Sequence, residues 1–531
     1  MPSLSSRRRW RCLKLLETSK TLKQLKQSHS LLIASGLGRS PFALSRLLAF
    51  YSSLDRHSVD YAWAVFSRVE RPTTACIYNT MLHALLLHDR PAAAIHVYSR
   101  MLADAVRPDH YTLPCILKAC AKLIPRSLGE SVHGQGIKLG LVSNLFVGNA
   151  LIAFYIALNG EQAAPGKVFD EMPDRDAVSW TLAISGSAKA GDVEAARALF
   201  DKAPVKDLGV WGAMISGYVQ DNCFKEGLHL FQLMQLEVPY IEPDEALLVS
   251  VLCACAHLGT LETGVWIHRL VERRRLRPTT RLWTGLIDMY AKCGFLGLAK
   301  RLFDEMPQRD TICWNAMISG FAMNGVGGAA LRLFCDMEKE GIVPDNVTLI
   351  AVLIACSYSG MACEGLRILQ RLLRDYNIEL QSELYGCLVE LFGRAGLLEE
   401  AKEILLLRDS SKNNNGSPED DAVAWRALLN ACCSHGDIKL AELAAERLLH
   451  IEHDSGAYVL LSNFYAAKGK QEEAQKVRMK MRNGAVDKKA PGCSSVQIGG
   501  VGFEFVAGEK MHPQMEEICL LLEKLNRHSD Y

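Results

Sequence analysis

An internal repeat constrains this 531-residue sequence more than any other feature. Three segments are nearly identical, namely KVFDEMPDRD at 167–176, ALFDKAPVKD at 198–207 and RLFDEMPQRD at 301–310. Phe169, Phe200 and Phe231 follow one another at intervals of 31 residues. Self-similarity at a period of about 20 to 50 residues is typical of proteins in which each repeat forms one supersecondary element.

A second landmark shows that the repeats differ in length. It is a tryptophan followed by an apolar run, which reads WTLAISG at 180, WGAMISG at 211 and WNAMISG at 314. Trp180 and Trp211 are 31 residues apart, whereas Trp211 and Trp314 are 103 apart, a distance that repeats of 37, 35 and 31 residues would fill. The array therefore mixes repeat lengths.

Each repeat has the layout of a helix, a turn and a second helix. Apolar residues such as Met317, Ile318 and Phe321 recur at helical spacing after the tryptophan. A glycine then breaks the pattern, as at Gly191, Gly294 and Gly325. A second amphipathic stretch follows, and one such pair of helices cannot bury its apolar face alone. The sequence therefore predicts an all-α fold, a right-handed superhelical solenoid of helix-turn-helix repeats with a concave groove.

Composition limits the function classes. The 60 Lys and Arg residues are balanced by 59 Asp and Glu residues, which argues against a non-specific grip on phosphates. Nucleic-acid binding would have to depend on local placement of side chains. The 17 cysteines include no C-x-x-C pair and many lie in apolar stretches, which favours buried thiols in a reduced compartment. No run of 18 apolar residues occurs, so no membrane span is predicted.

The N-terminal segment has the composition of an organellar transit peptide. Residues 1–16, MPSLSSRRRWRCLKLL, contain four arginines, one lysine and three serines, and the first acidic residue is Glu17. A basic disordered tail is the alternative. The arginine content favours the mitochondrion, with the chloroplast as the alternative location.

Specific phrases in the sequence resemble the pentatricopeptide repeat (PPR) family of land plants. Among them are YNTMLHAL at 78, LIDMYAKCG at 286, WNAMISGF at 314 and YVLLSNFYAAKGK at 458. Tetratricopeptide repeats share the layout, but their W-x2-L-G-x2-Y pattern and uniform period of about 34 residues are missing. The mixed repeat lengths resemble those of the PLS subclass, in which long, ordinary and short repeats alternate. The resemblance implies degenerate repeats at 17–74 and an array at 75–420.

The family resemblance implies that the fifth and last residues of a repeat read one RNA base together. Carried onto this sequence, the pairs are Asn79 with Asp109, Asn149 with Asp176, Thr181 with Asp207, Gly212 with Asp244, Thr284 with Asp310, and Asn315 with Asp345. In the family, Asn with Asp favours U and Thr with Asp favours G, whereas Gly212 departs from the code.

The repeats from 75 to 345 then imply the 5′-to-3′ pattern U-n-U-G-n-n-G-U. No base is assigned to the pairs Pro114 with Asn144, Val249 with Thr279 and Ile350 with Gln381, or to Gly386. For any single residue of these pairs, a helix cap or a turn is the ordinary alternative. Five matched pairs at fixed offsets favour base recognition.

The C-terminal part resembles the extension that accompanies C-to-U editing in the family. A polar loop, SKNNNGSPED at 411–420, precedes two extension motifs (E1/E2) within 421–490, and a truncated E+/PG-box tail covers 491–531. Zinc deaminases of nucleobases need H-x-E followed by P-C-x-x-C. The only H-x-E, at His450, ends a predicted helix and is interpreted as structural. No catalytic residue, metal or cofactor is therefore predicted.

The leading hypothesis is a sequence-specific factor that binds single-stranded organellar RNA and recruits a DYW-type deaminase in trans. Other editing factors are expected to dock on the C-terminal extension, with no DNA or membrane partner. Intron splicing or transcript stabilisation by the same groove is the alternative within RNA binding. A protein-binding helical-repeat scaffold is the alternative from another class.

Overall fold

The computed structural model describes residues 21–522, apart from residues 39, 55, 70–73, 124–125, 159–162, 275–277, 376–381, 411–417, 452–454, 484–492, 499–500, 507–513 and 515–516. The expected transit peptide at 1–16, most of the polar loop and much of the C-terminal tail lie outside the described residues. The chain divides into two compact units, one that ends at Ala254 and one that begins at Cys255.

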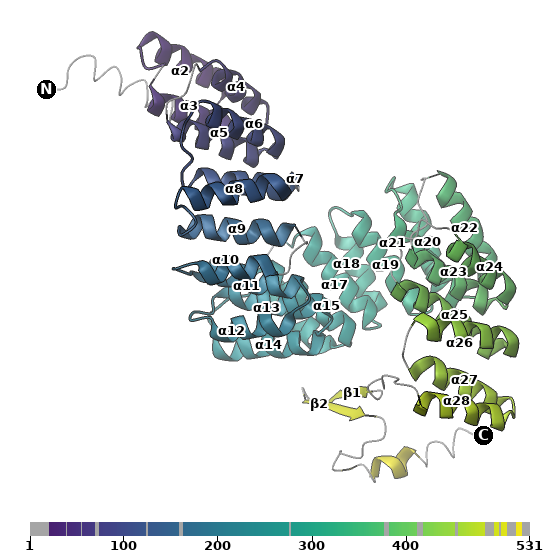
Figure 1. The fold of residues 1–531 in the computed structure, drawn as a ribbon. Coiled ribbons are helices and arrows are strands. Elements are labelled where there is room, and N and C mark those ends of the chain that lie inside the picture. Colours follow the sequence, from purple (N-terminus) through teal and green to yellow (C-terminus); the bar gives the residue numbers. More distant parts are fainter. Residues whose placement is uncertain are drawn as a thin grey trace. The chain divides into compact units, whose positions relative to one another are not determined.

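The first compact unit is built from helix pairs that follow one another along the chain (Figure 1). Its elements are α2 (Leu22–Ala34), α3 (Pro41–Leu54), α4 (Arg56–Ser67), α5 (Ala75–Leu87), α6 (Pro91–Ala103), α7 (Thr112–Leu123), α8 (Arg126–Lys138), α9 (Leu145–Ala157), α10 (Ala163–Glu171), α11 (Ala177–Lys189), α12 (Val193–Lys202), α13 (Leu208–Gln220), α14 (Phe224–Glu237) and the start of α15 (Glu245–Leu258). The first helices of successive repeats, α5, α7, α9, α11 and α13, contact one another in that order.

The second compact unit continues the same arrangement. After the end of α15 it contains α16 (Leu261–Arg273), α17 (Thr280–Lys292), α18 (Leu296–Glu305), α19 (Thr311–Met323), α20 (Gly327–Lys339), α21 (Asn346–Tyr358), α22 (Ala362–Asp375), α23 (Ser382–Arg394), α24 (Leu398–Ser410), α25 (Pro418–His435), α26 (Ile438–Ile451), α27 (Ser455–Ala467), α28 (Gln471–Asn483), β1 (Cys493–Ile498) and β2 (Val501–Val506). The first helices α17, α19, α21, α23, α25 and α27 again contact one another in sequence.

The repeat at 177–207 shows how a helix pair starts and turns. In the repeat at 177–207, the Asp176 carboxylate caps α11 by accepting a hydrogen bond from the Ser179 backbone N–H at 2.8 Å. The helix ends before Gly191, whose φ of 80° few other residues adopt. The Asp192 backbone N–H then donates to the Ser187 carbonyl at 3.0 Å, which closes the turn before α12.

The repeated Phe and Trp landmarks form the contact between neighbouring repeats. Phe200, on the second helix of one repeat, meets Trp211, on the first helix of the next, with ring centroids 4.9 Å apart and planes at 71°. The same edge-to-face pairs recur at Phe169 with Trp180 and at Phe303 with Trp314. In these three repeats the basic residue that precedes the last Asp covers the Phe ring, namely Arg175, Lys206 and Arg309.

These observations confirm the all-α class of helix-turn-helix repeats, with one addition. β1 and β2 pair antiparallel, from Cys493 opposite Val506 to Ile498 opposite Val501, and sequence analysis had not predicted this hairpin. His450 lies in the last turn of α26, as predicted, whereas Glu452 lies outside the described residues. No helix in the described part of the chain is both long enough and apolar enough to span a membrane.

Removal of an edge-to-face pair is expected to lower the stability of the fold locally. Trp211 is 1% exposed, and a Trp-to-Ala change in a core costs about 3–5 kcal/mol. Trp211→Ala should therefore lower the hydrogen-exchange protection of α12 and α13, because each repeat is stabilised mainly by its neighbours. Leu236→Ala, at a side chain that is 79% exposed, is the control and should leave protection unchanged. Equal protection in both variants would contradict the role of the ring contact.

Candidate nucleic-acid interface

Three of the six predicted pairs are joined by hydrogen bonds. The pair Asn315 with Asp345 shows the geometry, because Asp345 caps α21 and its Oδ1 accepts from the Thr348 backbone N–H at 2.8 Å. The Asn315 Nδ2 donates to the same Oδ1 at 3.0 Å. The Thr348 hydroxyl donates to the Asn315 Oδ1 at 2.6 Å. One carboxylate therefore caps a helix and holds the amide of the preceding repeat.

The two other Asn pairs repeat this network. The Asn79 Nδ2 donates to both carboxylate oxygens of Asp109, at 2.9 and 3.0 Å, and the Thr112 hydroxyl donates to the Asn79 Oδ1 at 2.7 Å. The Asn149 Nδ2 donates to the Asp176 Oδ1 at 3.2 Å, and the Ser179 hydroxyl donates to the Asn149 Oδ1 at 2.7 Å. Each of these Asp residues thus caps the next helix and also holds the amide of the paired Asn.

The hydrogen bonds of this network keep two of the carboxylates charged. Burial raises the pKa of Asp109, but hydrogen bonds from the Thr112 backbone, the Asn79 amide and the Tyr111 backbone together outweigh it, so the pKa lies below its usual value. The pKa of Asp176 is lowered in the same way, against burial, by hydrogen bonds from Ser179 and Asn149. Both groups are therefore anions at neutral pH.

The two Thr pairs have a different geometry. The Thr181 hydroxyl donates to the Ala177 carbonyl of its own helix at 2.8 Å, and the Thr284 hydroxyl donates to the Thr280 carbonyl at 2.8 Å. Among the described residues, neither threonine is hydrogen-bonded to its paired Asp. Asp207 and Asp310 still cap the next helix through the backbone N–H groups of Val210, at 2.9 Å, and Cys313, at 3.0 Å. These repeats present two oxygens as acceptors.

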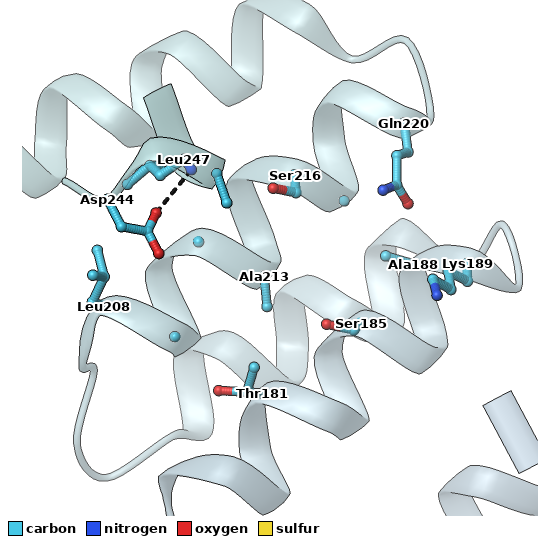
Figure 2. Close-up of a pocket in the computed structure, with 14 residues that line it drawn as sticks. Thr181, Ser185, Ala188, Lys189, Leu208, Ala213, Ser216, Gln220, Asp244 and Leu247 are labelled. Atoms are coloured by element: carbon cyan, nitrogen blue, oxygen red, sulfur yellow. Dashed lines mark hydrogen bonds between the residues drawn. The ribbon is translucent and has the colours of Figure 1, made fainter. Parts of the chain in front are cut away.

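The Gly212 pair leaves a cavity of about 270 Å³ in the first compact unit. A Cβ added to Gly212 would meet nothing within 4 Å. Figure 2 shows the side chains around this space: Thr181, Ser185 and Ser216, with Asp244 towards one end and Lys189 and Gln220 towards the other. The pair Asn79 with Asp109 lines a second cavity, of about 670 Å³, together with Tyr111 and His83. Both cavities are large enough for a nucleobase.

Sequence reasoning missed a row of exposed apolar residues at the second position of the repeats. Val178, Ile312 and Val347 are 54%, 64% and 53% exposed although they belong to apolar helices. Tyr111 and Phe146 occupy the same position and are also exposed. The signal in the sequence was an apolar residue two positions after the capping residue. Exposed apolar side chains at one repeat position indicate a contact surface.

Fold and site together define a helical-repeat protein in which successive repeats present a pair of polar side chains. The model of the PPR repeat matches residues 178–207, 209–237, 281–310, 383–407 and 423–443. The model of the PPR repeat family matches residues 73–122 and 309–357, and the E motif model matches residues 435–497.

Relatives match along almost the whole chain. One pentatricopeptide repeat-containing protein of Arabidopsis thaliana is 36% identical and covers 97% of this chain and 94% of the relative. A chloroplastic relative from the same plant is 34% identical over 99% of this chain and 83% of the relative, and a mitochondrial one is 32% identical over 97% and 89%. The crystal structure of PPR10 from maize aligns at 16% identity over 91% of this chain and 79% of that one, with a TM-score of 0.45. The chain belongs to the pentatricopeptide repeat family.

The lowered pKa of Asp176 predicts a pH-dependent stability. A carboxylate whose pKa is lower in the folded state stabilises the fold above its unfolded pKa of about 3.9, and this stabilisation is lost as the pH falls through the folded pKa. The midpoint of thermal unfolding should therefore differ between wild type and Asp176→Asn by a constant amount from pH 7 to about pH 5. The difference should shrink below about pH 4. Asp174→Asn, at an exposed position of the same turn, is the control, and an equal difference there would contradict this assignment.

Proposed function

We propose that this protein binds single-stranded RNA in a sequence-specific way and marks sites for C-to-U editing in organellar transcripts. The observation that supports the proposal most directly is the difference between Asn and Thr pairs in their hydrogen-bonding groups. RNA bases in single strands are read through donors and acceptors on their Watson–Crick edges. Each pair therefore offers a pattern of donors and acceptors that complements the edges of some bases and not of others.

The Asn pairs offer one donor beside one acceptor. In the repeat of Asn315, the amide oxygen and one amide hydrogen are engaged within the protein, so one Nδ2 hydrogen remains for RNA. The Asp345 carboxylate keeps lone pairs beyond those that cap the helix. Uracil presents the O4 acceptor next to the N3–H donor, which is the complementary arrangement. This supports U at the three Asn repeats.

The Thr pairs offer two acceptors. The Thr181 hydroxyl hydrogen is engaged with a backbone carbonyl, so its oxygen faces a ligand with lone pairs only. The Asp207 carboxylate also only accepts. A Cβ added to Gly209 would lie 3.0 Å from the Thr181 Oγ1 and 3.3 Å from the Asp207 Oδ1, which places both oxygens close to the same point beside the Gly209 backbone. Guanine has two adjacent donors, N1–H and the N2 amino group, and this supports G at the Thr repeats.

Two further features fit a single-stranded nucleic acid. Exposed Val178, Ile312 and Val347 offer apolar contacts to the faces of bases, which stack without sequence preference. Lys189, an exposed cation beside the cavity of Gly212, is placed to meet a phosphate. Binding would thus combine base reading with local charge, as the near-zero net charge of the chain requires.

The editing role rests on the C-terminal region and on the mixed repeat lengths. The E motif match covers residues 435–497, and the family extension accompanies editing. The deaminase would act in trans, because the 531 residues contain no C-x-x-C with which a nucleobase deaminase holds zinc. Relatives are named for both organelles, which supports an organellar location, and the Arg-rich N-terminal segment favours the mitochondrion.

RNA binding by the purified chain tests the recognition step. RNA with the pattern U-n-U-G-n-n-G-U should bind more tightly than RNA in which the U and G positions are exchanged, by about 1–3 kcal/mol for each well-separated mismatch, the range measured for base pairs in specific protein–DNA sites. The measurement is a gel shift at a stated salt concentration. Equal affinity for both RNAs would refute base reading, and no binding at modest salt would favour the protein-scaffold hypothesis.

Lys189→Ala is the matched control for that experiment. A lysine that contacts a phosphate contributes equally to the binding of all sequences. Its removal should therefore lower the affinity for both RNAs by the same factor, and should reduce the slope of log affinity against log salt concentration by about 1. A change in the ratio of the two affinities would mean that Lys189 reads a base.

Editing is tested in plants that lack the protein. Loss of one or a few C-to-U changes in organellar cDNA, each downstream of a match to the pattern, is the expected result. If editing is normal but a transcript is unspliced or unstable, the editing hypothesis is wrong and a role in splicing or stabilisation takes its place. The proposal of RNA recognition would still stand.

A further inference from the structure

The side chain at the third position of the next repeat differs systematically with the type of pair that precedes it. After each of the three Asn pairs this side chain carries a hydroxyl, in Thr112, Ser179 and Thr348. After the Thr and Gly pairs it is Val210, Cys313 or Leu247, none of which has a hydroxyl. All six side chains are at most 1% exposed, so contact with solvent does not explain the three hydroxyls.

The hydroxyl has one hydrogen, and the distances show where it goes. In the three Asn networks the hydroxyl oxygen lies 2.7, 2.7 and 2.6 Å from the Asn Oδ1. It lies farther from the Asp Oδ1, at 3.0, 2.9 and 2.9 Å. The backbone N–H of the Asp donates to the hydroxyl, as Asp345 does to Thr348 at 3.1 Å. The Asn amide is therefore held at both ends, its nitrogen by a carboxylate and its oxygen by a hydroxyl.

Threonine at the fifth position does not depend on such a hydroxyl, although the Thr284 Oγ1 lies 2.9 Å from the Cys313 Sγ of the next repeat. Thr181 and Thr284 each donate to a carbonyl of their own helix at 2.8 Å, which orients their hydroxyls within one repeat. An asparagine has no comparable bond in these repeats, so its orientation depends on the next repeat. This explains why an apolar side chain suffices at Val210.

Orientation matters because a donor beside an acceptor fits two pyrimidines. Uracil pairs its O4 with the donor and its N3–H with the acceptor. Cytosine presents the N4 amino donor and the N3 acceptor at the same two positions of its edge, so its donor and acceptor lie in the reverse order. The choice between U and C must therefore depend on which side of the carboxylate the amide nitrogen is held.

We infer that the buried hydroxyl at the third position of the following repeat is a third specificity-determining residue, which positions the asparagine amide so that the pair selects U over C. This inference rests on the proposed RNA recognition and deepens it. The hydroxyl is a positioning residue, because it acts through the asparagine and does not itself face the RNA.

The sharpest test converts a Thr repeat into an Asn repeat with and without the hydroxyl. Thr181→Asn and the double variant Thr181→Asn with Val210→Thr are compared on RNAs with U, C, A or G at the fourth nucleotide of the pattern. Val and Thr have nearly the same shape. The double variant should show a ratio of U to C affinity about three- to tenfold higher than the single variant, the effect of one hydrogen bond.

The reverse change removes a native hydroxyl. Thr348→Val should lower the ratio of U to C affinity at the eighth nucleotide by about three- to tenfold, whereas Thr348→Ser should keep it. Thermal unfolding of both variants is measured in parallel. A purely structural role would lower stability and the affinities for U and C together, leaving their ratio unchanged, and that result would overturn the inference.

The outcomes separate this inference from the proposed function. Wild-type protein that prefers G at the fourth nucleotide and U at the eighth supports base reading by the pairs. If wild type discriminates in this way but the single and double variants have equal ratios, the role of the hydroxyl is wrong and base reading stands. If wild type binds all RNAs equally, both are overturned.

Discussion

The Asp carboxylate that caps the first helix in several repeats is the interaction on which the rest of the site depends. Four orphan N–H groups at a helix N-terminus need acceptors, and Asp176, Asp207, Asp310 and Asp345 each supply one. The same carboxylate lies at the end of the preceding repeat, beside its fifth residue. A requirement of helix stability therefore places a carboxylate at the same point of these repeats, where the proposed function uses it for recognition.

The aromatic contacts between repeats fix the distance over which this arrangement recurs. Phe200 against Trp211 and Phe303 against Trp314 have nearly the same separation and angle, although they lie in different compact units. The basic residue before the capping Asp lies over the Phe ring, and in Arg175 and Arg309 it also donates to the Phe carbonyl at 3.0 Å. Packing and capping are thus joined within a few residues, so the polar pair is held by the core.

Repeats that share this frame differ in the groups they present. Asn repeats offer a donor and an acceptor, Thr repeats two acceptors, and the Gly212 repeat an open cavity with Asp244 at its rim. These differences cost the fold little, because the fifth residue does not take part in the aromatic contact. Under the proposed function, substitution at few positions, one of which is buried in the next repeat, would change the recognition pattern.

The sequence by itself determined the repeat, its variable length and the helix pairs, because these are encoded locally in the order of apolar, glycine and capping residues, and the six residue pairs were what the family resemblance implied. Helices α9, α11 and α19 begin at the first residue of the repeats predicted at 145, 177 and 311. Only the tertiary structure decided which pairs are hydrogen-bonded, that Thr112 and Thr348 anchor an amide about 33 residues away, and that Val178 and Ile312 stay exposed. Those outcomes depend on the distance between side chains of neighbouring repeats, and no local pattern in a sequence specifies that distance.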